Sequence, residues 1–319
     1  MHISVGYDMS HKVSVVIPTY NRPSFLYSAI KSVLNQTFQD FEIIVVDDAS
    51  TDNTRKVVAE FDEKRICYLR HRENRGGSTA RNTGIKRSKG EFIAFLDDDD
   101  LWVRSKLEKQ LDLFNKKPEI GAVYSGAWII NKSGEIIGYD LPFLRGNILP
   151  DMLRKNHVGS CSFVMVRKEC FDRIGTFDET LPASQDWDMW VRLGEHYHFD
   201  FCHEPLVLYR VHERRITADP YAKMEAARSL FKKFSTSIDT FNNRGKTLGC
   251  WHYRFGRIYC EMEDREKGKR EFLMAINNDP YSVDYYVRLF ASFFSLTTYN
   301  ALRRLLDSFL PVSFKPKVT

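Results

Sequence analysis

Four consecutive aspartates, Asp97–Asp100, follow the apolar run Phe92–Leu96. Adjacent carboxylates repel one another, and burying any of them is costly unless it is paired or bound to metal. Magnesium and manganese take oxygen ligands, typically one or two carboxylates together with substrate phosphates. Asp97 and Asp99 can point the same way from an extended chain because one residue separates them. The pattern predicts a nucleotide-diphosphate site in which one carboxylate holds a cation and the other a sugar hydroxyl.

The alternative interpretation of the same run is a solvated acidic turn that caps the next helix, a role that would suit Asp100. A second carboxylate, Asp48, ends the apolar stretch "FEIIVVDD" and has two interpretations of its own. It could cap a helix that begins near Asp52, or accept a hydrogen bond from a nucleobase N–H. The preceding "PTYN" stretch offers Tyr20 as a stacking face and main-chain groups for the base.

Strand and helix patterns alternate through the first half of the chain. Continuous apolar runs predict buried strands, and apolar residues at helical spacing predict the helices between them. The expected strands are 13–18, 41–48, 65–71 and 91–96. The expected helices are 21–36, one that begins near Asp52, 76–88 and 104–114. This order predicts a parallel, doubly wound α/β sheet, with ligands beyond the carboxyl ends of its strands. Both groups of aspartates fall at such ends.

The second half has a different pattern. An antiparallel pair is expected over 122–140, around a turn at 131–134, followed by a helix over 184–197 and a strand over 204–212. Beyond Pro220 the pattern is helical, with a two-helix hairpin over 256–290 and a short, basic, amphipathic helix over 301–310. We therefore expect an α/β domain over 1–218 and an all-helical C-terminal region over 219–319.

Composition narrows the class of protein. The chain has 319 residues, is 43% hydrophobic and 28% charged, and has a formal net charge of +5. These values are typical of a globular protein, and so mild a charge gives no reason to expect a nucleic-acid partner. The six cysteines are scattered, which favours a reducing compartment over a disulfide framework or zinc site. Neither a signal peptide nor a membrane-spanning run is evident, so a cytoplasmic location is expected.

Three stretches together resemble the family-2 inverting glycosyltransferases with the GT-A fold. They are "VSVVIPTYNRPSFLYSAIKSVLNQTFQDFEIIVVDDASTDNT", "NRGGSTARNTGIKRSKGEFIAFLDDDDLW" and "QDWDMWVRL", and the resemblance runs from about Lys12 to His212. It implies a UDP-sugar or related nucleotide-sugar donor, Mn²⁺ or Mg²⁺, and a single displacement that inverts the anomeric centre. The acceptor would be a glycan or a lipid-linked glycan. Contact with a membrane surface through 301–310 would suit the latter.

The resemblance also implies roles for individual residues. Asp48 would bind the base beside Tyr20, with Pro18 and Thr19 supplying backbone contacts. Arg81 would lie near the nucleotide, Asp97 or Asp98 would hold the ribose, and Asp99 would contact the metal. His212 would be a further ligand of the metal or diphosphate, with Arg214 and Arg215 near phosphate. Asp186 occupies the position of the catalytic base, whereas Asp188 is expected to pair with Arg192 four residues on.

This sequence departs from the family pattern at Gln185, where an acid commonly precedes the base. Two other functions therefore stay open. A decayed, non-catalytic domain that binds nucleotide or glycan would fit Gln185, although Asp97, Asp99 and Asp186 disfavour it. A sugar-nucleotide pyrophosphorylase would normally have a glycine-rich, basic loop where this chain has "PTYNRP". A dehydrogenase is disfavoured because no G-x-G-x-x-G follows the first strand.

Overall fold

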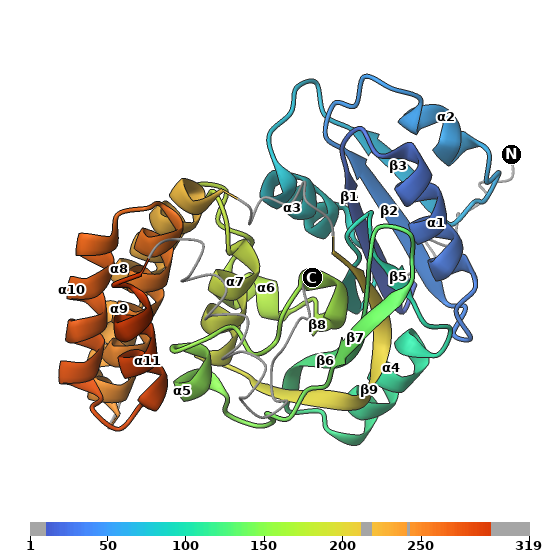
Figure 1. Ribbon diagram of the computed structural model, residues 1–319. Coiled ribbons are helices and arrows are strands. Elements are labelled where there is room, and N and C mark those ends of the chain that lie inside the picture. The colour runs from blue at the N-terminus through green and yellow to red at the C-terminus, as the bar shows by residue number, and fades with distance from the viewer. Residues whose placement is uncertain (1–10, 212–218, 241–242, 295–319) are drawn as a thin grey trace, which may run out of the picture. The chain divides into compact units, whose positions relative to one another are not determined.

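The computed structural model describes residues 11–211, 219–240 and 243–294 (Figure 1). Packing divides the chain into two compact units. Unit 1 comprises residues 1–146, 160–177 and 196–210, and unit 2 comprises residues 147–159, 178–195 and 211–319. The expected domain boundary at 218/219 stays a prediction. Two segments that precede it, 147–159 and 178–195, pack with the C-terminal helices.

Unit 1 is built on a mixed sheet that has nine strands in the described part of the chain. The strands follow the order β3-β2-β1-β4-β8-β6-β9-β5, with β7 paired to β6. They are β1 Val13–Thr19, β2 Phe41–Asp47, β3 Ile66–Arg70, β4 Phe92–Phe95, β5 Leu101–Trp102, β6 Ile120–Ile130, β7 Ile136–Asp140, β8 Val164–Arg167 and β9 His198–Arg210. The predicted α/β class, a mostly parallel sheet with a small antiparallel addition, is confirmed.

Strands β1 to β4 are mutually parallel, and β1, β2 and β4 are buried along their whole length. Burial on both faces is what their continuous apolar sequences predict. The expected β6–β7 hairpin is also present. Strands β5 and β8 were not expected, because strands of two and four residues carry little periodic signal. The parallel pairing brings the carboxyl ends of β1, β2 and β4 to one edge of the sheet.

Helices connect the strands of unit 1, the first four as the sequence predicts, whereas the short helix over 170–174 was not expected. They are α1 Pro23–Leu34, α2 Thr54–Ala59, α3 Gly77–Arg87, α4 Lys106–Lys116 and α6 Cys170–Ile174, with a 3₁₀ turn, η1, at Cys161–Phe163. Helix α3 packs closely on β1 at Gly84. A Cβ atom added to Gly84 would lie 2.2 Å from Cγ1 of Val16, which is fully buried in the sheet. Glycine is therefore the residue that lets α3 approach the strand.

Unit 2 contains the remaining helices. They are α5 Leu149–Met152, α7 Gln185–Gly194, α8 Pro220–Thr240, α9 Arg244–Glu261, α10 Arg265–Asn278 and α11 Val283–Ala291. The expected hairpin is confirmed as α9 and α10, and Pro280 follows the end of α10. Every described segment beyond residue 219 is helical or a turn between helices.

Buried tryptophans hold the core of unit 2 together. The rings of Trp187 and Trp251 are stacked, with centroids 5.0 Å apart and planes 6° from parallel. Their indole N–H groups donate to the carbonyls of Met152 and Leu153, at 2.6 Å and 2.9 Å. Each large apolar ring is thus buried without leaving its single donor unsatisfied. These bonds fasten the segment 147–159 to α7 and α9.

Within the described residues, no helix combines the length and the apolar character that a membrane span requires. The amphipathic helix expected over 301–310 lies outside the described part of the chain.

Replacing Gly84 by alanine should destabilise unit 1. Alanine favours helix over glycine by about 1 kcal/mol, but the added methyl group would overlap Val16, and such overpacking costs about 1–3 kcal/mol. We expect a net loss in the free energy of unfolding, measured by urea denaturation. Gly138→Ala is the matched control, because its added Cβ would meet only Cδ1 of Ile129, at 3.9 Å. A Gly84→Ala variant as stable as wild type would contradict the packing argument.

Candidate functional site

The four aspartates lie just beyond the carboxyl end of β4, and their exposure alternates. Asp98 and Asp100 are buried, with only 5% and 1% of their surface exposed. The side chains of Asp97 and Asp99 retain 26% and 17% exposure. Asp97 and Asp99 are therefore the pair available to a ligand. The sequence left the register of the D-x-D pair open, and this alternation favours Asp97-x-Asp99.

Arginines supply positive charge among these carboxylates. Nη1 of Arg22 lies 3.1 Å from Oδ1 of Asp98 and 2.9 Å from Oδ2 of Asp99. Arg81 forms an ion pair with Asp97. Burial opposes the charge on Arg22, but the neighbouring Asp98 and Asp99 together raise the pKa of its guanidinium. The expectation that a bound cation is the missing positive charge is thus incomplete, because the chain provides counter-charges of its own.

The two buried aspartates have structural partners. Thr19 donates its hydroxyl proton to Oδ2 of Asp98 at 2.7 Å. Burial raises the pKa of Asp98 to about 7. Asp100 accepts the backbone N–H of Arg210 at 2.9 Å, and burial raises the pKa of this carboxyl well above its usual range. The interpretation of Asp100 as a helix cap is wrong, because α4 begins at Lys106 and Ser105 occupies its N-cap.

Three further residues that the sequence did not single out stabilise the loop of aspartates. Arg210 donates from Nε to the Asp99 carbonyl at 3.0 Å, which ties the end of β9 to the loop. Ser162 accepts the backbone N–H of Asp97 at 3.0 Å, and Ser160 donates to the Asp97 carboxylate at 3.2 Å. Each comes from a distant part of the chain, so no local sequence signal marks it.

Asp48 lies at the end of β2, beside the end of β1. Its carboxylate accepts backbone N–H groups from Arg75 at 3.0 Å and Gly76 at 2.7 Å, and it pairs with Nδ1 of His71 at 2.7 Å. Asp48 thus organises the turn that leads into α3. Its interpretation as a cap of the following helix is wrong, because α2 begins at Thr54 behind Asn53. Its contact with a nucleobase stays a prediction.

The end of β1 lies next to Asp48 and carries the other residues expected at the base. The backbone N–H of Asp48 donates to the Thr19 carbonyl at 2.9 Å. Pro18 is buried within β1, whereas Tyr20 is 44% exposed and so offers an accessible ring. Asn21 follows in the left-handed region, with φ of 53°, and its side chain accepts the N–H of Thr51 at 2.8 Å. The turns after β1 and β2 are therefore fixed to one another.

The carboxylates at this edge suit a hard divalent cation by the chemistry of their donor atoms. Within the described residues, no three or more histidine, cysteine or acidic side chains gather as a cage for a metal. A cation held by only one or two carboxylates would have its coordination completed by substrate phosphates. His212, the other expected ligand, lies outside the described residues, as do Arg214 and Arg215.

In unit 2, Asp186 lies in the first turn of α7. Its Oδ1 accepts a hydrogen bond from the backbone N–H of Trp187 at 2.8 Å. Its Oδ2 accepts one from Nδ2 of Asn156 at 3.2 Å. The Asn156 side-chain carbonyl accepts the N–H groups of Val158 and Gly159 at 3.2 Å and 2.9 Å, which fixes the amide that faces Asp186. Asn156 was not singled out from sequence.

Asp188 has a structural role instead. It is fully buried and accepts a hydrogen bond from Nε of Arg192 at 2.9 Å, so the expected i,i+4 pair is confirmed. Lys233 lies 2.6 Å from its other oxygen. Gln185 donates its side-chain amide to the Leu181 carbonyl at 2.9 Å.

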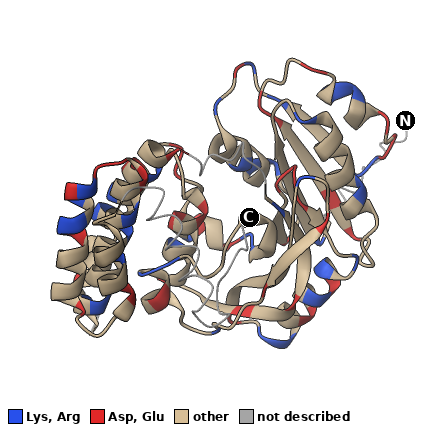
Figure 2. Cartoon of the chain, in the orientation of Figure 1, with Lys and Arg blue, Asp and Glu red and all other residues tan. Residues whose placement is uncertain are grey.

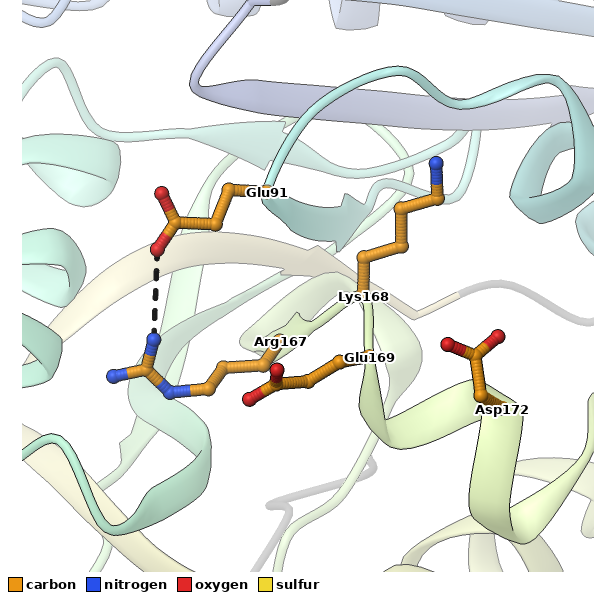
Figure 3. A pocket seen from close by; sticks show the side chains of 5 residues that line it. All are labelled: Glu91, Arg167, Lys168, Glu169 and Asp172. Carbon is orange, nitrogen blue, oxygen red and sulfur yellow. Dashed lines mark ion pairs between the residues drawn. The ribbon is translucent and has the colours of Figure 1, made fainter.

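A separate charged pocket lies at the opposite end of β4 (Figure 3). It is lined by Glu91, Arg167, Lys168, Glu169 and Asp172. Arg167 faces Glu91 at 3.6 Å, and Lys168 donates to the Ser88 carbonyl at 2.6 Å. Because β4 separates this pocket from the four aspartates, it is not the candidate site.

Comparison with known proteins identifies relatives. Residues 14–175 match the family described as glycosyl transferase family 2. An uncharacterized glycosyltransferase of Rickettsia typhi is 33% identical over 230 residues, which cover 70% of this chain and 71% of the relative. The UDP-Glc:alpha-D-GlcNAc-diphosphoundecaprenol beta-1,3-glucosyltransferase WfgD of Escherichia coli is 34% identical over 181 residues, covering 57% of this chain and 69% of the relative.

Solved structures share the GT-A fold with this chain. S. aureus TarS 1–349 in complex with UDP-GlcNAc aligns with a TM-score of 0.62 and 16% identity, covering 93% of this chain and 92% of that one. The mannosyltransferase PcManGT of Pyrobaculum calidifontis, in complex with GDP-Man and Mn²⁺, aligns with a TM-score of 0.57 and 18% identity, covering 93% and 84%. At these identities the likeness concerns the fold.

The raised pKa of Asp98 predicts a dependence of stability on pH. Between the usual aspartate pKa and about 7, the folded chain keeps a proton on Asp98 that the unfolded chain releases. This contribution is fully present at low pH and is lost as the pH rises through about 7. We therefore expect wild type to lose stability relative to Asp98→Asn between pH 5 and pH 8, measured from urea midpoints. A pH-independent difference between the two proteins would contradict the assignment.

Proposed function

Because the chain belongs to glycosyl transferase family 2, we propose that it is a metal-dependent, inverting glycosyltransferase. It moves a sugar from a nucleotide-sugar donor to an acceptor hydroxyl. The observation that carries the proposal is the pairing of Asp97 and Asp99, the two partly exposed carboxylates at the edge of a parallel sheet where ligands bind. Both carboxylates are paired with arginines, Asp97 with Arg81 and Asp99 with Arg22, yet their side chains stay partly exposed to a ligand.

The proposed donor is a UDP-sugar. Two of the similar proteins support this choice, since the E. coli relative is named for UDP-Glc and the TarS structure holds UDP-GlcNAc. Tyr20, exposed at the end of β1, would stack on the base, with main-chain groups of Pro18 and Thr19 nearby. Asp48, which organises the turn into α3, would bind the base. Arg81 and Asp97, which form an ion pair, would lie beside the ribose and phosphates.

Asp99 would hold Mn²⁺ or Mg²⁺, whereas Asp97 or Asp98 would hold the ribose. The Mn²⁺ in the PcManGT complex supports a divalent ion without deciding between the two. Such an ion stabilises negative charge on a departing diphosphate. Of the two candidates for the ribose, Asp97 is favoured because Asp98 is buried against Thr19. His212 stays a proposed further ligand.

Asp186 is the proposed catalytic base. A carboxylate that removes the proton from an attacking hydroxyl, with no covalent intermediate, gives inversion at the anomeric carbon. The hydrogen bonds from Trp187 and Asn156 hold the Asp186 carboxylate in one orientation. Gln185 is turned to the Leu181 carbonyl and serves the local fold. Its replacement of the family's usual acid therefore leaves the proposed base in place.

The proposed acceptor is a lipid-linked glycan, and the diphosphoundecaprenol acceptor in the name of the E. coli relative supports it. Unit 2 has a surface suited to such a partner. Val283, Tyr286, Phe290 and Phe293 recur at three- and four-residue spacing along α11 and its C-terminal turn, and they are 73%, 45%, 62% and 64% exposed. We call these four residues the α11 stripe. The opposite face of α11 is buried through Tyr285, Arg288 and Ala291.

The charge of this part of the chain complements an anionic lipid surface. Residues 219–319 contain 17 lysines and arginines against 11 aspartates and glutamates, whereas the whole chain has 47 against 42. Lys269 of α10 lies 4.5 Å from the ring centroid of Phe293, so a cation borders the α11 stripe. Lysines and arginines recur along the described helices of unit 2 (Figure 2). Exposed aromatic residues flanked by cations are typical of helices that bind membrane surfaces. Like charges would oppose a second copy on the same stripe.

Donor binding and turnover should separate in one set of variants. We expect calorimetric titration to show that one of UDP, dTDP, GDP and CMP binds wild type only when manganese is present. Asp99→Asn should abolish this binding. Asp186→Asn should retain it and lose about 10³-fold or more in sugar transfer, because only the proton acceptor is removed.

Gln185→Ala is the matched control for the Asp186 variant, since it alters the neighbouring side chain and should retain most of the activity. Absence of nucleotide binding under every condition would contradict the proposed function. Full activity in Asp186→Asn would contradict the role of Asp186 as the base and would leave the rest of the proposed function intact.

Replacing both Tyr286 and Phe290 by serine should weaken binding to anionic lipid vesicles by about tenfold or more, because the exposed apolar area of the α11 stripe is lost. Co-flotation of the full-length protein with vesicles of anionic phospholipid measures this. Tyr139→Ser is the matched control, because Tyr139 is 56% exposed on β7 of unit 1. Equal flotation of wild type and the double variant would exclude the α11 stripe as the contact.

A further inference from the structure

We propose that Arg22 is a built-in counter-ion of Asp99 that competes with the divalent metal. The free enzyme would then bind metal weakly, and metal binding would depend on the nucleotide diphosphate. This inference rests on the proposed function. It concerns a residue whose contacts with the aspartates become evident only in the folded chain.

The geometry places one guanidinium nitrogen between two carboxylates. Nη1 of Arg22 lies 3.1 Å from Asp98 and 2.9 Å from Asp99. Such charge-assisted contacts are among the stronger hydrogen bonds in proteins. A metal ion at the same Asp99 oxygen would be repelled by the guanidinium beside it. Arg22 and the metal therefore compete for one oxygen atom.

The two ends of this arrangement differ in how firmly they are held. The Asp98 side chain is only 6% exposed and is also fixed by the Thr19 hydroxyl. Asp99 is 17% exposed and the Arg22 side chain is 35% exposed. The contact between Arg22 and Asp99 is thus the one that can open to solvent or to a ligand, while Asp98 keeps its hydrogen bond from Thr19.

The backbone of Arg22 cannot follow its side chain. Arg22 occupies the N-cap position of α1, directly before Pro23. The preceding residue, Asn21, is fixed to the turn after β2, because its N–H donates to Ser50 at 2.9 Å and its side chain accepts from Thr51 at 2.8 Å. The guanidinium can therefore swing on its flexible stem while its Cα atom stays beside the aspartates.

This arrangement couples metal to nucleotide. Without ligand, Arg22 offsets repulsion between Asp98 and Asp99, which lie side by side in a poorly solvated loop. A bound diphosphate brings negative charge that offers the Arg22 guanidinium another partner. Arg22 can then release Asp99, whose oxygen becomes available as a ligand. The free protein would so avoid holding a metal when no donor is present.

The test is manganese binding in the absence of nucleotide, followed by electron paramagnetic resonance of the free ion. Arg22→Gln should bind manganese about tenfold more tightly than wild type, because a partly exposed charge pair no longer competes. Arg22→Lys keeps the charge and should stay within a few-fold of wild type. The matched control is Arg65→Gln, which removes another arginine–carboxylate pair, with Glu63 at 2.8 Å.

Two further measurements separate the outcomes. In Arg22→Gln/Asp99→Asn the gain in affinity should disappear, since it arises at Asp99. Manganese should also raise the melting temperature of Arg22→Gln more than that of wild type, a readout that requires no activity. Unchanged or weaker manganese binding by Arg22→Gln would overturn the inference about Arg22, while nucleotide-dependent metal binding by wild type would leave the proposed function intact. Failure of every protein to bind manganese, with or without nucleotide diphosphate, would overturn both.

Discussion

The neutralisation of negative charge at the end of β4 is the constraint on which the candidate site depends. Asp98 and Asp100 are almost entirely buried, so each must receive hydrogen bonds from the chain around it. Thr19 at the end of β1 and Arg22 before α1 serve Asp98, while the backbone of Arg210 in β9 serves Asp100. Two inward carboxylates thereby tie the connection between β1 and α1, and the distant end of β9, to the loop after β4.

The same constraint determines what remains outside. Asp97–Asp100 form a turn in which the backbone N–H of Asp100 donates to the Asp97 carbonyl at 3.0 Å, and with Asp98 and Asp100 fixed inward it is Asp97 and Asp99 that keep partial exposure. Their neighbours are arginines, which balance charge but, unlike a buried hydrogen-bond network, leave the oxygens accessible. The buried pair thus provides rigidity, and the outer pair is the one that we propose as the source of ligand atoms.

In unit 2, hydrogen bonds from uncharged donors likewise hold a carboxylate in position. The indoles of Trp187 and Trp251 fasten the segment 147–159 by one hydrogen bond each. Asn156 of that segment then presents its amide to Asp186. A packed aromatic core therefore governs the orientation of a single carboxylate. Asp188, two residues on, is buried and paired with Arg192 and Lys233, so the neighbouring aspartates of α7 have separate roles.

The sequence by itself determined the elements and the edge of the sheet. Apolar runs identified β1, β2, β3 and β4, helical spacing identified α1, the initial glycines indicated α3, and the order of strands and helices predicted parallel pairing. That pairing suffices to place Asp48 and Asp97–Asp100 at one edge, since parallel strands end on the same side. The Asp188–Arg192 pair was equally predictable because it depends on helical spacing alone.

Tertiary structure decided which charges meet. Arg22 and Asp98 are 76 residues apart, and Arg210 and Asp100 are 110 apart, so no local periodicity relates them. An extended chain would place Asp97 and Asp99 on one side, but the folded chain turns at Asp98 and Asp99, and the contacts of Thr19 and Arg210 decide which two carboxylates are buried. In the same way, Asp48 and Asp100 are of a residue type that often caps helices. Their carboxylates instead accept hydrogen bonds from the backbone of Gly76 and of Arg210, which are distant in sequence. Hydrogen bonds of this kind form between elements brought together by packing, and packing is a property of the whole fold.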